Sequence, residues 1–260
     1  MKQLILSAFI LSCLSSLAIN PKVVLSNDTN RLDPSGKKQG LWKEIIAGYE
    51  WYGNYFNDQK NGTWVSYGAV KTPGNPLMVN KTESYINGRK NGICIDIDQN
   101  GYILRQESYK NDTLDGTSTL YSSANRVRSQ STYRNGKLNG IKKLYNSENN
   151  KLQEEGLYMN GLREGVTKWY YIEGGVSIEY FYTHGMLNGK MKTYYKNGNT
   201  SSEGIYKDNE LEGDYFEYYE DGKPKNLGKY IKGKKEGSWK EYDEQGKMKL
   251  VKYKNDVASK

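Results

Sequence analysis

The chain has few of the residues on which catalytic and metal sites usually depend. Its 260 residues include one histidine, His184, and two cysteines, Cys13 and Cys94. A single histidine excludes clusters of histidine ligands, and the sequence contains no phosphate-binding loop. His184 occupies the first position of an expected turn, and Cys94 stands between two isoleucines, which indicates a small buried residue rather than a nucleophile. We therefore expect a protein that is not an enzyme and has no cofactor.

Long hydrophobic runs are also scarce. One run, Leu4–Leu14, follows an N-terminal lysine and precedes small residues that end at Ala18. This layout predicts a secretory signal peptide over residues 1–18, because the run is too short to span a bilayer. We expect a protein that is secreted or held in the cell envelope. Cys13 loosely resembles the cysteine of a lipoprotein signal, so a lipid anchor is the lesser alternative.

Most of the chain lacks an excess of charge of either sign. The formal net charge is +8, but residues 223–260 hold twelve lysines and five acidic residues, whereas residues 19–222 are balanced. A balanced chain cannot follow a phosphate backbone, so we exclude nucleic acid as a partner. We interpret the basic end as an exposed edge that blocks unwanted strand pairing. The alternative is a contact surface for an acidic partner or an anionic lipid.

What the chain does have is a tyrosine that recurs about every 24 residues, with a glycine seven positions later. The tyrosines are Tyr55, Tyr85, Tyr109, Tyr133, Tyr158, Tyr182, Tyr206, Tyr230 and Tyr253, and the glycines run from Gly62 to Gly237. A fixed period of this size predicts a repeat array rather than a single compact domain. We place the array at residues 33–256, between a lead-in over residues 19–32 and a tail over residues 257–260.

Each repeat has the composition of a β-hairpin. Pairs such as Asn135-Gly136 and Asn160-Gly161 supply the positive φ that tight hairpin turns need. Runs such as Glu179–Tyr182 between the turns have strand composition, and helical periodicity is absent. Neither face of the strands is uniformly apolar, which excludes a sandwich or barrel. The sequence therefore predicts an all-β, elongated antiparallel meander whose core is a ladder of tyrosine rings and lysine stems.

The unit Glu155–Gly165 resembles a MORN repeat: a glycine, an aromatic residue two positions later, an Asn-Gly pair and a further glycine follow in that order. The run Tyr194–Gly198 brings the chain closer to the variant repeats of bacterial YwqK-like proteins, which bear a toxin–antitoxin label. The resemblance implies a β-hairpin array used for protein contacts, dimerisation or lipid binding. The antitoxin label fits an exported protein poorly.

The repeats depart from the MORN pattern in three ways. Tyrosine replaces the usual tryptophan, and the glycine two positions before it is missing from most units. The second glycine of the family's Gly-x-Gly is also replaced by larger residues, namely Trp42, Trp64, Met191, Tyr215 and Trp239.

One segment matches the pattern of a calcium-binding loop. Asp96, Asp98, Asn100 and Glu107 stand at loop positions one, three, five and twelve, with glycine at position six. That glycine is also the ordinary turn glycine of its repeat, and no helices are expected to flank the segment. We therefore expect no metal site here and keep the match as a weak alternative.

These patterns favour an interaction scaffold whose partner is an unidentified protein. The alternative is a module that binds a cell-surface glycan or an anionic lipid through tyrosine rows and the basic end. The loop around Pro73 and Pro76, six residues longer than its equivalents, is a further candidate contact. The candidate interaction residues are Tyr170, Tyr194, Tyr218, Lys232, Lys234, Lys235, Lys249 and Lys252.

Overall fold

The structure, a computed structural model, describes residues 29–68, 78–122 and 125–258. The expected signal peptide and the Pro73/Pro76 loop lie outside these residues. All regular elements of the described part are β-strands, and it contains no α-helix. The prediction of an all-β chain is therefore confirmed. The same residues include no helix with the length and apolar character needed to cross a membrane.

The chain divides into two compact units, which meet in sequence between Gly101 and Tyr102. The first unit contains β1 (Arg31–Leu32), β2 (Lys38–Ile46), β3 (Tyr49–Phe56), β4 (Gln59–Tyr67), β5 (Val79–Ile86), β6 (Arg89–Lys90) and β7 (Gly92–Ile97). The second contains β8 (Ile103–Lys110), β9 (Thr113–Ser122), β10 (Arg126–Arg134), β11 (Lys137–Tyr145), β12 (Leu152–Met159), β13 (Leu162–Tyr170), β14 (Val176–Thr183) and β15 (Met186–Tyr194). It continues with β16 (Thr200–Lys207), β17 (Glu210–Leu211), β18 (Gly213–Tyr218), β19 (Pro224–Ile231), β20 (Lys234–Tyr242), β21 (Met248–Lys254) and β22 (Val257–Ala258).

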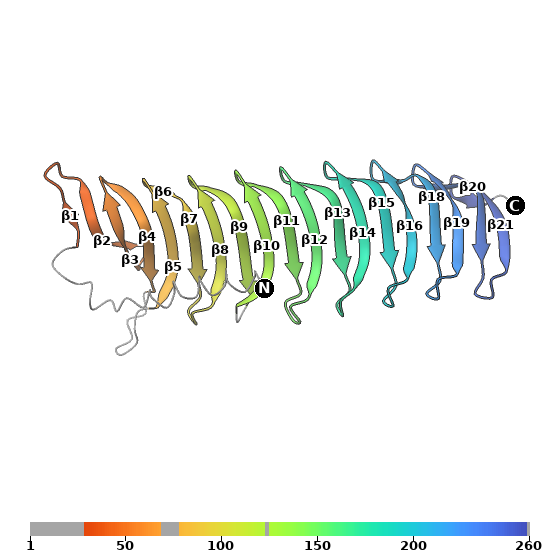
Figure 1. Cartoon of the computed structure of the whole chain (residues 1–260), viewed down its shortest axis with the longest axis horizontal. Coiled ribbons are helices and arrows are strands. Elements are labelled where there is room, and N and C mark those ends of the chain that lie inside the picture. Colours follow the sequence, from red (N-terminus) through yellow and green to blue (C-terminus); the bar gives the residue numbers. More distant parts are fainter. Residues whose placement is uncertain (1–28, 69–77, 123–124, 259–260) are drawn as a thin grey trace, which may run out of the picture. The chain divides into compact units, whose positions relative to one another are not determined.

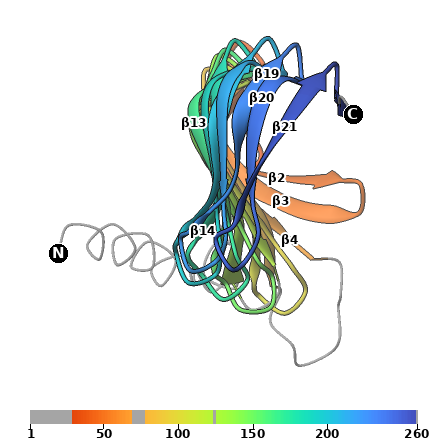
Figure 2. The same ribbon diagram turned by 90° about the vertical axis from the view of Figure 1, so that its right-hand side faces the viewer.

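Within each unit, strands that follow one another in sequence pair antiparallel, as in a meander (Figure 1). The repeat's glycine faces the tyrosine of the next repeat, as Gly140 faces Tyr158 and Gly189 faces Tyr206. Most strand pairs contain one register shift. Because each repeat adds the same hairpin, the strands of the second unit follow nearly the same curve when viewed along their succession (Figure 2). The predicted array of β-hairpins is confirmed.

One edge of the second unit, which we call the Asn edge, consists of two-residue turns. Both turn residues have positive φ, for example 51° at His184 and 84° at Gly185. Asparagine, aspartate and glycine tolerate this conformation best, which explains the Asn-Gly pairs in the sequence. The second turn residue donates its N–H to the preceding repeat, as Gly185 does to the Arg163 carbonyl at 2.9 Å. His184 is thus a turn residue, as predicted.

The other edge of the second unit, the Tyr edge, has four-residue turns that end on a glycine from β13 onward. In three successive turns the glycine N–H donates to the carbonyl of Tyr171, Tyr195 or Tyr219 at 2.9 to 3.0 Å. The hydroxyl groups of these tyrosines donate to a backbone carbonyl of the next repeat, as Tyr195 does to Tyr218 at 2.7 Å. Both edges therefore link neighbouring repeats as well as closing their own hairpins.

One face of each unit, the ring face, carries the recurring tyrosines and most of the buried side chains. In the first unit Tyr55 lies edge-on to Trp64, with ring centroids 5.1 Å apart, and Lys60 Nζ lies 3.9 Å from the centroid of Trp64. In the second unit Lys235 Nζ lies 4.3 Å from the centroid of Trp239, which is fully buried. The predicted ladder of rings and lysine stems is present on this face.

Packing on the ring face also explains glycines that stand two positions before the recurring tyrosine in some repeats. A Cβ built on Gly228 would lie 2.2 Å from the ring of Trp239, so glycine leaves the space that this ring fills. The same geometry relates Gly53 to Trp64 in the first unit. Gly204 faces Tyr215 in a similar way, because a Cβ built on it would lie 3.0 Å from that ring. A ring at one of these positions thus requires glycine at the position that faces it.

Candidate interaction surfaces

The opposite face of the second unit is where the repeats differ most. The residue before each tyrosine pairs across the strands with the residue after the preceding repeat's glycine. These pairs change from Thr117/Thr132 through Ile141/Leu157, Val166/Phe181 and Lys190/Ile205 to Asp214/Lys229 and Ser238/Lys252. Cross-strand partners share a face, so the chemistry of this face is hydroxyl, then apolar, then charged along the array.

The apolar pairs belong to a continuous exposed surface over β11 to β16, which we call the apolar patch. It consists of Ile141, Leu157, Met159, Leu162, Val166, Phe181, Met186 and Ile205, whose side chains are 39% to 54% exposed. A groove of about 450 Å³ adjoins the patch at Val166 and Phe181 and is also lined by Gly189. The Phe181 ring lies over Gly189, where a Cβ would approach it to 2.9 Å. A gathering of exposed apolar side chains of this kind is typical of an interaction surface.

A row of ion pairs borders the apolar patch on the same face. Lys168 pairs with Glu179, and Lys192 with Glu203, each at 2.9 Å. The hydrogen bond from Lys192 lowers the pKa of Glu203, and the one to Glu179 raises the pKa of Lys168. These pairs keep the border polar while the patch beside it stays apolar.

The three candidate tyrosines lie at this polar border. Tyr194 donates to Glu179 at 3.2 Å and Tyr218 donates to Glu203 at 3.1 Å. Burial raises the pKa of both phenols and of Tyr170, so all three stay neutral at physiological pH. Each ring is half-buried, and two of the three hydroxyl groups already have a partner within the sheet.

The five candidate lysines do not gather at one place. Lys235 packs over the rings of Trp239 and Tyr253 on the ring face, and Lys249 faces Glu241 there. Lys232 is a turn residue at the Asn edge, and Lys234 follows that turn. Lys252 pairs with Ser238 on the opposite face. The structure thus distributes them over both faces and one edge.

The residues of the calcium-loop match have other partners. Asp98 accepts from the backbone of Asn100 and Gly101 to close a turn, and Asp96 pairs with Lys81 at 3.4 Å. In the second unit Glu107 is buried and accepts from Tyr109 at 2.8 Å. In the part of the chain with described coordinates, no three acidic, histidine or cysteine side chains form a group that could hold a metal ion. Cys94 is buried as expected, and burial raises the pKa of its thiol.

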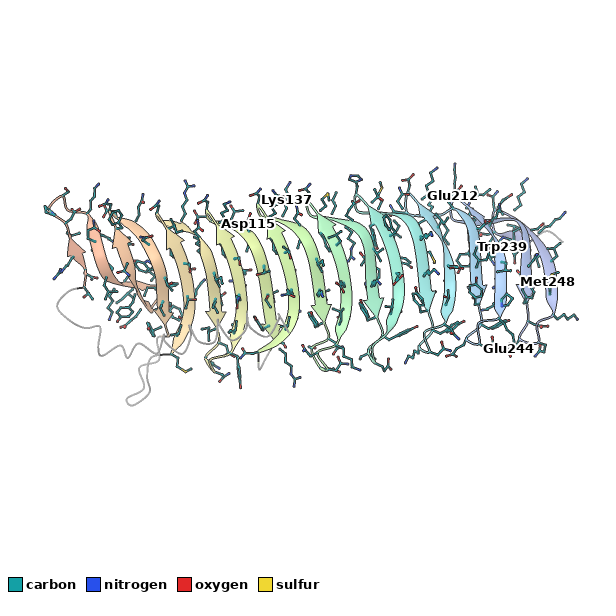
Figure 3. All side chains as sticks on the ribbon, viewed as in Figure 1. Asp115, Lys137, Glu212, Trp239, Glu244 and Met248 are labelled. Atoms are coloured by element: carbon teal, nitrogen blue, oxygen red, sulfur yellow. The ribbon has the colours of Figure 1, made fainter. Side chains whose placement is uncertain are left out.

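A column of carboxylates at the Asn edge was not recognised in the sequence. Six residues after the tyrosine, Asp115, Glu164, Glu212 and Glu236 each accept a hydrogen bond from the first N–H of the next repeat's turn. Figure 3 shows Asp115 and Glu212 at this edge, with Trp239 on the sheet between the two edges. The sequence signal was an acidic residue directly before the repeat's glycine, and it could have been found by aligning the repeats.

Taken with the fold, these features define an all-β repeat protein built from hairpins of about 24 residues. A family model described as "MORN repeat variant" matches residues 187–208, 211–232 and 235–255. The similarity to MORN-variant repeats thus lies within residues 187–255. No curated protein sequence matches the chain.

Among solved structures, the chain is similar to part of TarM of S. aureus, including a mutant in complex with Fondaparinux, alpha-GlcNAc-glycerol and UDP. The identity is 12%, the match covers 50% of this chain and 22% of TarM, and the TM-score is 0.23. A GtfA/B complex bound to UDP and GlcNAc matches at 10% identity over 48% of this chain and 22% of that chain, with a TM-score of 0.17. Scores this low carry no argument about function.

Proposed function

We propose that the protein is an exported, non-enzymatic scaffold that binds another protein through the apolar patch. The observation that carries the proposal is a difference between the two faces. The side chains of the opposite face change in chemistry along the array, whereas the recurring tyrosines of the ring face are kept. Residues that only hold the sheet together would repeat with the same period as the tyrosines. The two apolar pairs, Ile141/Leu157 and Val166/Phe181, are instead consecutive, and their side chains are exposed. The export step rests on the signal-like segment at residues 1–18.

The test compares two double variants of the same face in a pull-down from envelope extract. Val166→Ser with Phe181→Ser changes the apolar patch, whereas Thr117→Ser with Thr132→Ser changes the hydroxyl pair of an earlier repeat. We expect the first variant to lose its protein partner and the second to keep it. Retention of the same partner by both variants would contradict the proposal.

The second candidate function is binding to an anionic lipid or a glycan. It is favoured by exposed Lys240 and Lys252, which lie beside exposed Leu250 on the opposite face, so that apolar and cationic groups alternate there. Lipid and glycan arrays test it, and loss of an array signal on deleting residues 223–260 would support it. A kinship closer to the YwqK-like repeats than to other MORN variants also remains a proposal.

A further inference from the structure

We infer that the Asn edge of the second unit holds a binding site for a carboxylate group beside the turn at Asn160. A pocket of about 380 Å³ lies there, lined by Arg134, Asn135, Lys137, Asn139 and Asn160. The pocket is at the edge that carries the carboxylate column, and its residue Asn160 directly follows Met159 of the apolar patch. Its chemistry follows from comparing this repeat with its neighbours.

In neighbouring repeats the equivalent position is filled by a carboxylate of the chain itself. The first turn N–H donates to Asp115 at 3.1 Å, to Glu164 at 2.9 Å and to Glu212 at 2.8 Å. The fourth example, Glu236, accepts from Asn255 at 2.9 Å. Four repeats thus show that the exposed N–H of this turn is placed to bind a carboxylate oxygen, in a charge-assisted hydrogen bond.

The repeat of Tyr133 lacks this built-in acceptor. Asn139 occupies the position of the carboxylate, and the N–H of Asn160 has no acceptor among the residues with described positions. An exposed N–H of this kind is satisfied by solvent until a better acceptor arrives. The replacement of a carboxylate by a neutral amide therefore leaves a preformed donor facing the pocket.

Two cations border the same pocket. Arg134 and Lys137 are exposed and form no ion pair within the described residues. Asp115 is the acidic group of the preceding repeat, and it accepts the N–H of Asn135, so the local net charge is +1. Figure 3 shows Asp115 and Lys137 projecting from the same edge. An unoccupied donor next to two cations favours an external anion.

A second asparagine repeat provides the contrast. Asn188 stands in the same column, and the next turn N–H, that of Asp208, likewise has no acceptor in the part of the chain that is described. The turn of this repeat, His184-Gly185, is however flanked by Thr183 and Met186, where the repeat of Asn139 has Arg134 and Lys137. The turn residue Asp208 is itself acidic and repels an anion. Loss of the carboxylate alone is thus not sufficient to form an anion site, and the two cations distinguish the Asn160 turn from the Asp208 turn.

The ligand we assign is a carboxylate, because four carboxylates of this chain already bind the equivalent N–H. An acidic side chain of a protein partner would bring its apolar neighbours onto Ile141 and Met159 of the apolar patch. The assignment of this carboxylate to a protein partner rests on the proposed function. The carboxylate site itself does not, since it is argued from the turn and the cations.

The test is a titration of the full chain with sodium acetate and, separately, with inorganic phosphate, followed by the NMR shifts of the backbone amides at constant ionic strength. We expect a saturable shift of the Asn160 amide with acetate and none at Asp208. In Asn139→Glu the new carboxylate fills the site, so the Asn160 amide no longer responds. The matched control, Asn188→Glu, keeps the response. Arg134→Gln or Lys137→Gln weakens binding by up to about fivefold, the effect of one exposed ion pair.

Three results would overturn the inference: equal, non-saturating shifts at Asn160 and Asp208, an unchanged response in Asn139→Glu, or a saturable response to phosphate without one to acetate. The unperturbed amides of each variant show whether it is folded. A failed pull-down would end the proposed function yet leave the acetate result intact, so the two failures are distinguishable.

Discussion

The side chains on the two faces of the second unit vary along the array in different ways. On the ring face, a ring at one position is matched by a glycine opposite it, as Gly228 makes room for Trp239 and Gly204 for Tyr215. On the opposite face, the pairs change in chemistry without such compensation, from hydroxyl to apolar to charged. The difference indicates that the ring face is constrained by packing, whereas the opposite face is free to be used for binding.

The largest effect should come from removing a ring of the ring face. Trp239 is fully buried, and its ring centroid lies 5.2 Å from that of Tyr230. We expect Trp239→Ala to lower the free energy of unfolding by about 3 to 5 kcal/mol, measured by urea unfolding followed by circular dichroism. Leu250→Ala on the opposite face, where the side chain is 56% exposed, is the control and should cost less than about 0.5 kcal/mol. Equal losses in both variants would remove the distinction between the faces.

A methyl group added to the ring face should have the next largest effect. The φ of Gly228 does not fall in the left-handed region, so the cost of Gly228→Ala comes from the missing space at Trp239. We expect a loss of about 1 to 3 kcal/mol in the free energy of unfolding. The double variant with Trp239→Ala should abolish this cost, because the ring that collides with the new methyl group is gone. The packing argument fails if Gly228→Ala costs the same in both backgrounds.

The ring face should also give the protein a pH dependence in the alkaline range. Burial raises the pKa of Tyr230 to about 12, from an ordinary value of 10.0. Folding thus favours the neutral phenol, and the stability it contributes is full below pH 10 and lost as the pH rises toward 12. The upper limit is about 2.7 kcal/mol, and solvent screening at this half-buried site reduces it to roughly 1 kcal/mol.

The measurement compares the free energy of unfolding of the unmodified protein and of Tyr230→Phe between pH 9 and 12. Lysines and other tyrosines titrate equally in both proteins, so the difference between the two curves isolates Tyr230. We expect this difference to shift in favour of the variant as the pH rises. Parallel curves would show that the Tyr230 phenol has an ordinary pKa.

Most of the fold could be predicted from the sequence because it depends on local signals. The pair Asn160-Gly161 forms a turn with positive φ in both residues, and the tyrosine period sets the length of each hairpin. The compensation between Gly228 and Trp239 could not be read in advance, because it requires the register of two strands. The apolar patch was missed for a related reason. Its members, such as Leu157 and Val166, become neighbours only when strands are paired.

The smallest effect on stability should come from a substitution in the apolar patch. This substitution tests most directly whether the two faces have different roles. Phe181 is 39% exposed and packs over Gly189. Because much of its ring already contacts water, we expect Phe181→Ser to lower the free energy of unfolding by less than about 1 kcal/mol. Urea unfolding should place the variant near the unmodified protein, while the pull-down shows a weakened partner. A loss as large as that of Trp239→Ala would mean that Phe181 belongs to the packing of the sheet, and the opposite face would then have a structural role.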